Sequence, residues 1–195
     1  MSLATLSPRE VAELAGAPKR VVEKAIEEHV LVPRAVRSEA SRRRRMLPLH
    51  AVAYAAVVAK LDLKLTAAQK KRLLHKLTRL EPQAVRAARI ELAPAVEVDI
   101  GRLVGDAMDR ALHYRAARDK FIVVDEEIKG GTPVIRGTRI TVYSVLGQID
   151  HGDTVEDILN DNPDIAPEAV EGAIVYARTH PFVPRRGGRP WKKVA

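Results

Sequence analysis

The chain has 195 residues, of which 46% are hydrophobic and 4% are aromatic, and its formal net charge is +8. This length accommodates one large domain or two small ones, with cores built from aliphatic side chains. The absence of cysteine excludes disulfides, thiolate metal sites and cysteine catalysis. No apolar run approaches the roughly 18–20 residues that span a bilayer, and the N-terminus lacks an export signal. We therefore expect a cytoplasmic protein without a membrane partner.

Charge is distributed unevenly along the chain. Residues 1–80 carry a net charge of +10, residues 81–181 carry −7, and residues 182–195 carry +5. A uniformly basic protein could simply be soluble and bind nonspecifically to other molecules. A basic head, an acidic body and a basic tail instead predict two binding surfaces with different partners.

Two short helices are predicted at the N-terminus. Ser7 is a good N-cap, Pro8 suits the first helical position, and Glu10 completes a capping box. Gly16 ends this helix, and Pro18 begins the next one. Such a pair of helices is typical of a helix-turn-helix, whose second helix enters the DNA major groove. The candidate DNA-binding residues of that second helix are Lys19, Arg20 and Lys24.

Residues 34–47 are predicted to form a basic β-hairpin or loop, in the position of the wing of a winged domain. Its run of arginines is suited to neutralising several DNA phosphates, which makes binding depend strongly on salt. The candidate residues are Arg42, Arg43, Arg44 and Arg45. The alternative is a solvated helical bundle whose surface happens to be basic.

The middle of the chain is predicted to be largely helical. Pro48 is expected to begin a long apolar helix, and Thr66 to cap an amphipathic one. Alternating side chains favour a strand over 96–100, and a further helix is expected over 102–118.

The C-terminal part is predicted to combine short strands with three helices. Phe121–Val124 is a short apolar strand, and turns are expected at Gly130–Pro133 and at Gly137. The first helix is expected over about 142–151 and the third over about 167–179. The second helix lies between them and is expected to be capped by Thr154. The expected fold is therefore mainly α, with a winged helix-turn-helix, a helical connector and a small α+β domain. The expected boundaries are 1–80 for the head with its following helices, 81–118 for the connector, 119–181 for the C-terminal domain and 182–195 for a flexible tail.

Residues 5–61 resemble the winged helix-turn-helix head of the MerR family. The resemblance rests on Thr5-Leu6-Ser7, on Glu10–Leu14, on the second helix, on the exit Leu31-Val32-Pro33 and on the helix after the wing. The chain lacks that family's arginine–aromatic signature in the second helix and its effector-binding cysteines. The resemblance therefore implies DNA binding without metal or redox sensing.

Residues 119–180 resemble the domain-of-unknown-function family four-three-three. The specific signal is the core Pro133-Val134-Ile135-Arg136-Gly137-Thr138-Arg139-Ile140. The resemblance implies a short hairpin followed by a compact helical unit, in an antitoxin of the VapB kind that acts beside a toxin with a PIN-like ribonuclease domain. Arg136 and Arg139 are expected to form structural salt bridges. Because this region is acidic, we expect it to contact protein rather than DNA.

The basic tail is the expected toxin-binding segment, given that resemblance. The resemblance implies a toxin of the PIN type, which holds its divalent metal with a cluster of carboxylates. Arginine can pair bidentately with such carboxylates and so neutralise the acidic site. An exposed tryptophan beside cations suits an interface anchor. The candidate toxin-binding residues are Arg185, Arg186, Arg189, Trp191 and Lys192. The alternative is a solvated tail that adds nonspecific affinity for nucleic acid.

We therefore expect a type II antitoxin that represses its own operon and holds a PIN-like ribonuclease inactive. We expect a homodimer within a larger hetero-oligomer, because a helix-turn-helix dimer reads two half-sites. No catalytic constellation, metal site or cofactor motif is present in the sequence. One alternative is a stand-alone MerR-like regulator whose C-terminal domain serves oligomerisation. Another is an accessory of a nucleic-acid-processing enzyme.

Overall fold

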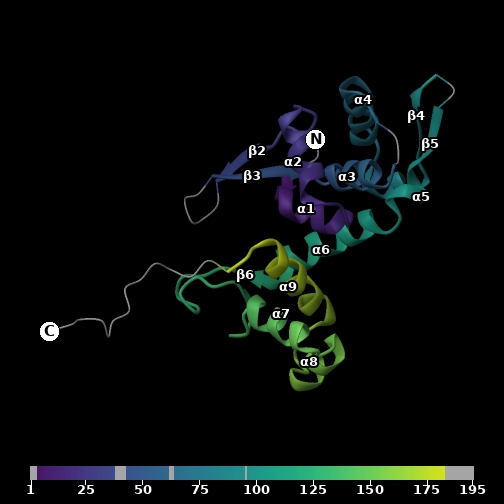
Figure 1. Cartoon of the computed structure of the whole chain (residues 1–195). Helices are drawn as coiled ribbons and strands as arrows, with labels where there is room; N and C mark the ends of the chain where they lie inside the picture. The colour runs from purple at the N-terminus through teal and green to yellow at the C-terminus, as the bar shows by residue number, and fades with distance from the viewer. Residues whose placement is uncertain (1–3, 38–42, 62–63, 95, 183–195) are drawn as a thin grey trace.

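The structure is a computed structural model and describes residues 4–37, 43–61, 64–94 and 96–182. It is mainly helical, with small antiparallel sheets. Figure 1 shows two lobes, one above the other. The N-terminal lobe holds the elements from β1 to α5, the C-terminal lobe holds those from β6 to α9, and α6 joins the two.

The first two helices are α1 (Pro8–Ala15) and α2 (Lys19–Glu27). The Ser7 hydroxyl accepts the Glu10 N–H at 3.3 Å, and the Glu10 carboxylate accepts the Ser7 N–H, so the predicted capping box is confirmed. Gly16 has φ of 60°, a left-handed conformation that glycine adopts without strain. This residue ends α1 and allows the sharp turn into α2.

The predicted basic hairpin is confirmed. Strands β2 (Arg34–Arg37) and β3 (Arg43–Pro48) pair antiparallel, and β1 (Ala4–Leu6) adds to the other edge of β3. The expectation that Pro48 begins a helix is wrong. Pro48 is the last residue of β3, opposite Ala4, and the helix begins at His50. A strand end tolerates the missing N–H of proline as readily as a helix start does.

Two helices complete the core of the N-terminal lobe. In α3 (His50–Lys60) every residue from 50 to 57 is buried, as expected of a helix that is apolar on all sides. Helix α4 (Ala67–Thr78) packs against α3 and buries Leu73 and Leu77. The predicted cap at Thr66 is confirmed, with Gln69 completing a capping box.

The part of the chain predicted to be the connector, residues 81–118, contains more structure than the sequence predicted. After the 3₁₀ helix η1 (Pro82–Ala87), β4 (Arg89–Ala93) pairs with the predicted strand, β5 (Val96–Asp99). The single helix expected over 102–118 is wrong. Gly105, with φ of 52°, separates α5 (Ile100–Val104) from α6 (Ala107–Phe121).

The C-terminal lobe follows the predicted order. Strands β6 (Ile122–Val123) and β7 (Val134–Ile135) form a two-stranded sheet. The predicted helices are then present as α7 (Val142–His151), α8 (Val155–Asp161) and α9 (Pro167–Thr179). Thr141 and Thr154 accept backbone N–H groups as N-caps of α7 and α8.

Helix α6 packs on both lobes. It contacts α1 and α3 on one side and α9 on the other, and buried side chains of both lobes form one continuous hydrophobic cluster. At the α6–α9 crossing, a Cβ on Gly172 would lie 3.1 Å from the Cβ of Ala117, so glycine permits the close approach. The expected boundary between residues 118 and 119 falls inside this helix. Among the described residues, no helix has the length and apolar character needed to cross a membrane.

The contact between α1 and α6 is centred on Glu10, a carboxylate with only 1% of its surface exposed. Glu10 accepts hydrogen bonds from the Tyr114 hydroxyl at 2.5 Å and from Arg118 Nη1 at 3.0 Å. The same Nη1 donates to the Thr5 carbonyl at 2.9 Å. Burial favours the neutral carboxyl, but Arg118, Tyr114 and the Ser7 N–H outweigh it and hold the pKa of Glu10 below 4.5.

Replacing Arg118 with methionine should destabilise the protein by about 3–5 kcal/mol, because Glu10 would remain buried without its cationic partner. The free energy of unfolding in urea, followed by circular dichroism, measures this loss. Arg115→Met on the same helix is the matched control, since Arg115 makes no ion pair within the described residues. The double variant Glu10→Gln/Arg118→Met should recover part of the loss. Equal, small losses for Arg118→Met and Arg115→Met would contradict this role.

Candidate nucleic-acid interface

The predicted DNA-binding residues of α2 lie together on its exposed side. Lys19 pairs with Glu23 at 2.8 Å, and Lys24 lies 3.9 Å from Glu28. Arg20 is exposed and has no ion-pair partner in the described part of the chain. The Lys19 and Lys24 side chains are 53% and 69% exposed, and ion pairs of exposed lysines contribute little to stability, so both lysines can exchange a carboxylate for a phosphate.

The N-terminus of α2 has the electrostatic character that favours anions. Its N-cap, Pro18, provides no side-chain hydrogen bond, and its first turn contains no acidic residue. The positive end of the helix dipole is therefore not offset by a carboxylate of that turn. At the other end, Lys70 of α4 pairs with Glu28 at 2.6 Å, and both side chains are largely buried. This ion pair fixes the orientation of α2 on the lobe.

The β2–β3 hairpin places its arginines on two faces. Val36 lies opposite Arg44 and Ala35 lies opposite Arg45, and alternate residues of a strand point to opposite sides. Arg44 and Arg45 are therefore presented on different faces, and both are exposed. Neither they nor Arg34 makes an ion pair with a described carboxylate. Arg43 belongs to β3, opposite Arg37, whereas Arg42 lies outside the described residues.

One face of the hairpin reaches the C-terminal lobe. Burial raises the pKa of the Tyr176 hydroxyl, and the nearby Arg44 guanidinium partly offsets that shift. Arg44 has the same effect on Tyr143, whose pKa is also raised by burial. The positive charge of Arg44 thus acts on tyrosine hydroxyls of both α9 and α7.

The end of α9 is a compact polar cluster around His180. The imidazole stacks on the Tyr176 ring, with centroids 4.1 Å apart, and the Tyr143 hydroxyl donates to the His180 carbonyl at 2.8 Å. Burial lowers the pKa of His180 below 6.5, and the charges of Arg44 and Arg118 act in the same direction. The imidazole is therefore neutral near pH 7.

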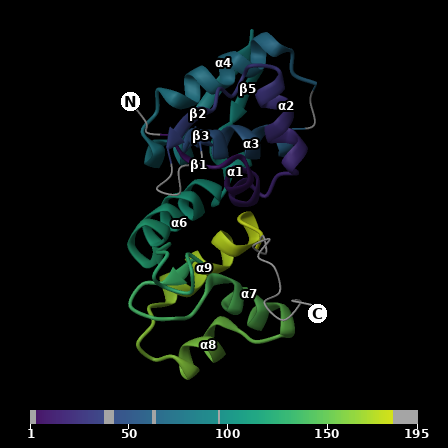
Figure 2. The same cartoon turned by 90° about the vertical axis from the view of Figure 1, so that its left-hand side faces the viewer.

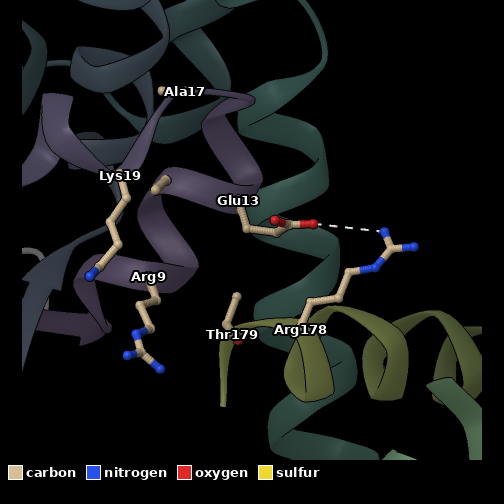
Figure 3. A pocket seen from close by; sticks show the side chains of 7 residues that line it. Arg9, Glu13, Ala17, Lys19, Arg178 and Thr179 are labelled. Carbon is tan, nitrogen blue, oxygen red and sulfur yellow. Dashed lines mark ion pairs between the residues drawn. The ribbon is translucent and has the colours of Figure 1, made fainter. Parts of the chain in front are cut away.

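A hollow of about 330 Å³ lies where the two lobes meet. Figure 3 shows Arg9 and Glu13 on α1, Lys19 at the start of α2, and Arg178 with Thr179 at the end of α9. Arg178 and Glu13 point toward each other, with a nitrogen–oxygen distance of 3.7 Å. Arg9 and Arg178 were not among the candidates identified from the sequence. A lone arginine in a helical segment carries no local signal, and only folding brings these two together.

The turn around Gly137 in the C-terminal lobe has a structural role that differs from the expected one. Arg136 Nε donates to the Lys120 carbonyl at 2.7 Å, and neither Arg136 nor Arg139 forms an ion pair with a described carboxylate. The expected salt bridges are therefore wrong. The hydrogen bond from Arg136 instead holds the turn against the end of α6. Gly137, with φ of 78°, allows the chain to reverse direction directly after Arg136.

A second hollow, of about 320 Å³, lies beside this turn and is bounded by residues 129–133, Tyr143 and Phe182. The predicted toxin-binding residues follow Phe182 in the chain and lie outside the described residues; they are Arg185, Arg186, Arg189, Trp191 and Lys192. In the part of the chain that the structure describes, no three His, Asp or Glu side chains are grouped so as to hold a metal ion.

Comparison with known proteins identifies the C-terminal lobe. Residues 122–177 match the family described as Protein of unknown function (DUF433), a range that begins at β6 and ends within α9. The uncharacterized protein y4eO of Sinorhizobium fredii is 35% identical over 89 residues, which are 46% of this chain and 40% of that protein. The X-ray crystal structure of Rv2018 from Mycobacterium tuberculosis is similar over 89% of this chain and 98% of that chain, with 15% identity and a TM-score of 0.37. The predicted resemblance of the C-terminal lobe to the DUF433 family is thus confirmed.

His180→Gln should remove part of the acid sensitivity of the fold. The pKa of His180 is lowered on folding, so below 6.5 the unfolded chain binds a proton that the folded protein does not. Stability is then lost as the pH falls through this window, and a neutral glutamine abolishes that loss. Unfolding in urea at a series of pH values measures it. The variant His151→Gln at an exposed position should keep the wild-type decline, and an identical decline in both variants would contradict the assignment.

Proposed function

We propose that this protein is an antitoxin of a type II toxin–antitoxin system that also binds the operator DNA of its own operon. The DNA-binding half of this proposal is carried by one observation. Helix α2 and the β2–β3 hairpin present cations that have no strong carboxylate partner within the described residues. Figure 2 views the molecule from the side on which both elements lie.

In this proposal the N-terminal lobe acts as a winged helix-turn-helix. Helix α2 enters the major groove with Lys19 and Arg20 foremost, and Lys24 lies one turn further along. The exposed arginines of the hairpin contact the flanking phosphates, which position the protein without reading sequence. The mixed charge of α2, with Glu23 between Arg20 and Lys24 and with Glu27 after them, suits contact with base edges better than contact with phosphates alone.

The antitoxin half of the proposal rests on the C-terminal lobe. Its match to the DUF433 family agrees with the resemblance on which the expectation of a VapB-like role was based. Residues 81–181 carry a net charge of −7, which disfavours a second DNA-binding surface over most of this region. The basic segment after Phe182 is then available for a nuclease whose catalytic centre is a group of carboxylates.

In this proposal the protein binds its operator as a homodimer, with one winged helix-turn-helix on each half-site. Two heads would contact half-sites about 34 Å apart, one turn of the double helix. Binding of the toxin by the C-terminal domain and tail would then build a larger hetero-oligomer around the DNA-bound dimer.

Replacing Arg42, Arg43, Arg44 and Arg45 with alanine should weaken binding to operator and to unrelated duplex alike. Each lost phosphate contact should reduce the slope of log K against log salt by about 0.9. Fluorescence anisotropy with labelled duplexes at several salt concentrations measures both quantities.

The control for this experiment removes the same charge from another surface. Lys64, Lys71, Arg72 and Arg79 are exposed at or near α4, and their replacement with alanine should change the slope less. Equal slopes for the hairpin variant, this α4 variant and the wild type would refute the DNA-binding role of the hairpin.

Deleting residues 183–195 should impair inhibition of a co-expressed PIN-like ribonuclease encoded beside this protein, while DNA affinity changes little. The rate of RNA cleavage by the purified complex measures inhibition, and copurification measures binding. Full inhibition by the truncated protein would place the interface on the folded lobe. Copurification of no nuclease with the intact protein would leave the stand-alone regulator as the better description.

A further inference from the structure

The hollow between the lobes has an excess of positive charge that the fold does not require. Arg9, Lys19 and Arg178 line it, together with one carboxylate, that of Glu13. Arg9 makes no ion pair with any described residue, and Lys19 pairs with Glu23 of its own helix. None of these cations belongs to the buried contact between Glu10 and Arg118 that holds α1 against α6.

The ion pair within the hollow is weak enough for an anion to replace it. Arg178 and Glu13 are 3.7 Å apart, and their side chains are 46% and 40% exposed. Exposed pairs typically contribute less than about 1 kcal/mol. The guanidinium of Arg178 is therefore available for the two parallel hydrogen bonds that arginine forms with phosphate.

The shape of the hollow also suits a small tetrahedral anion. Small side chains, Ala12 and Ala17, form part of its wall, and its volume is about 330 Å³. A water molecule occupies roughly 30 Å³ in the liquid, so the hollow admits a phosphate group with its hydrating waters. The cations that line the hollow come from three helices, α1, α2 and α9, so both lobes contribute positive charge to it.

The hollow lies on the side of the molecule that carries the proposed DNA-binding elements. In Figure 2 the end of α9 lies directly beneath α1, on the face that also shows α2 and the hairpin. Lys19 belongs both to the hollow and to the exposed side of α2. A duplex lying along α2 therefore brings its backbone to the mouth of the hollow.

We propose that this hollow binds a backbone phosphate of the DNA, so that Arg178 of the C-terminal lobe is a DNA contact beside Arg9 and Lys19. This inference rests on the proposed function, because it assigns a further contact to the same DNA. It makes the docking of α9 against α1 part of the DNA-binding surface. An otherwise acidic domain would then contribute one cation to nucleic-acid binding.

The test compares single-charge variants of the full-length protein in DNA binding. Arg178→Gln and Arg9→Gln should each lower affinity several-fold for operator and unrelated duplex, and each should reduce the salt slope by about 0.9. Glu13→Gln should raise affinity, because it removes the carboxylate that competes for Arg178. The double variant Glu13→Gln/Arg178→Gln should bind no better than wild type, which separates loss of the cation from repulsion by an unpaired Glu13.

Arg139→Gln is the matched control, because Arg139 is an exposed arginine of the same lobe that does not line the hollow. It removes the same charge and should leave the salt slope unchanged. Thermal midpoints within a few degrees of wild type would show that all variants are folded.

Three results would overturn the inference in distinguishable ways. If Arg178→Gln and Arg139→Gln behave alike while the hairpin variant loses affinity, the proposed function stands and the hollow is not a phosphate site. If the wild-type protein binds no duplex, both fail together. Binding of single-stranded RNA that depends on Arg178, with duplex binding unaffected, would also overturn the assignment to DNA.

Discussion

The arrangement of the two lobes depends on one buried carboxylate. Glu10 completes the N-terminal cap of α1, and the same carboxylate accepts hydrogen bonds from Tyr114 and Arg118 of α6. A buried charge must be paired and hydrogen-bonded, so α1 and α6 are held in one relative position. The position of helix α9 is set in turn by α6, because Gly172 lets α9 approach α6 closely at Ala117. The lobes therefore share a continuous core and do not form separately packed units.

The packing of the two lobes on α6 brings cationic side chains of distant segments to one side of the molecule. Arg44 of the hairpin interacts with Tyr176 at the end of α9, and Arg178 lies within an ion-pair distance of Glu13. The last described residue, Phe182, packs edge-on against Tyr143 in the same region. Phe182 therefore lies near the proposed DNA-binding surface.

Much of the fold could be predicted because its signals are local. The pairs Ser7 with Glu10, Thr66 with Gln69, and Thr154 with Asp157 satisfy helix N-termini within four residues, so the starts of α1, α4 and α8 are readable from spacing alone. Strand β4 was missed although Ile90 and Leu92 are buried on either side of exposed Glu91. Its alternation becomes a strand signal only once β5 is known to be its partner. Pro48 could not be assigned from the sequence for a similar reason, because a proline suits the start of a helix and the end of a strand equally.

By itself the sequence determined where helices and turns begin, which segments are basic, and which family the C-terminal lobe matches. These properties depend on caps, glycines, side-chain periodicity and a short motif, all of which act over a few residues. Only the tertiary structure decided that Glu10 meets Arg118, 108 positions away, and that Arg178 joins Arg9 and Lys19 at one hollow. The partners of a buried charge are chosen by how helices pack, and no local pattern encodes that choice.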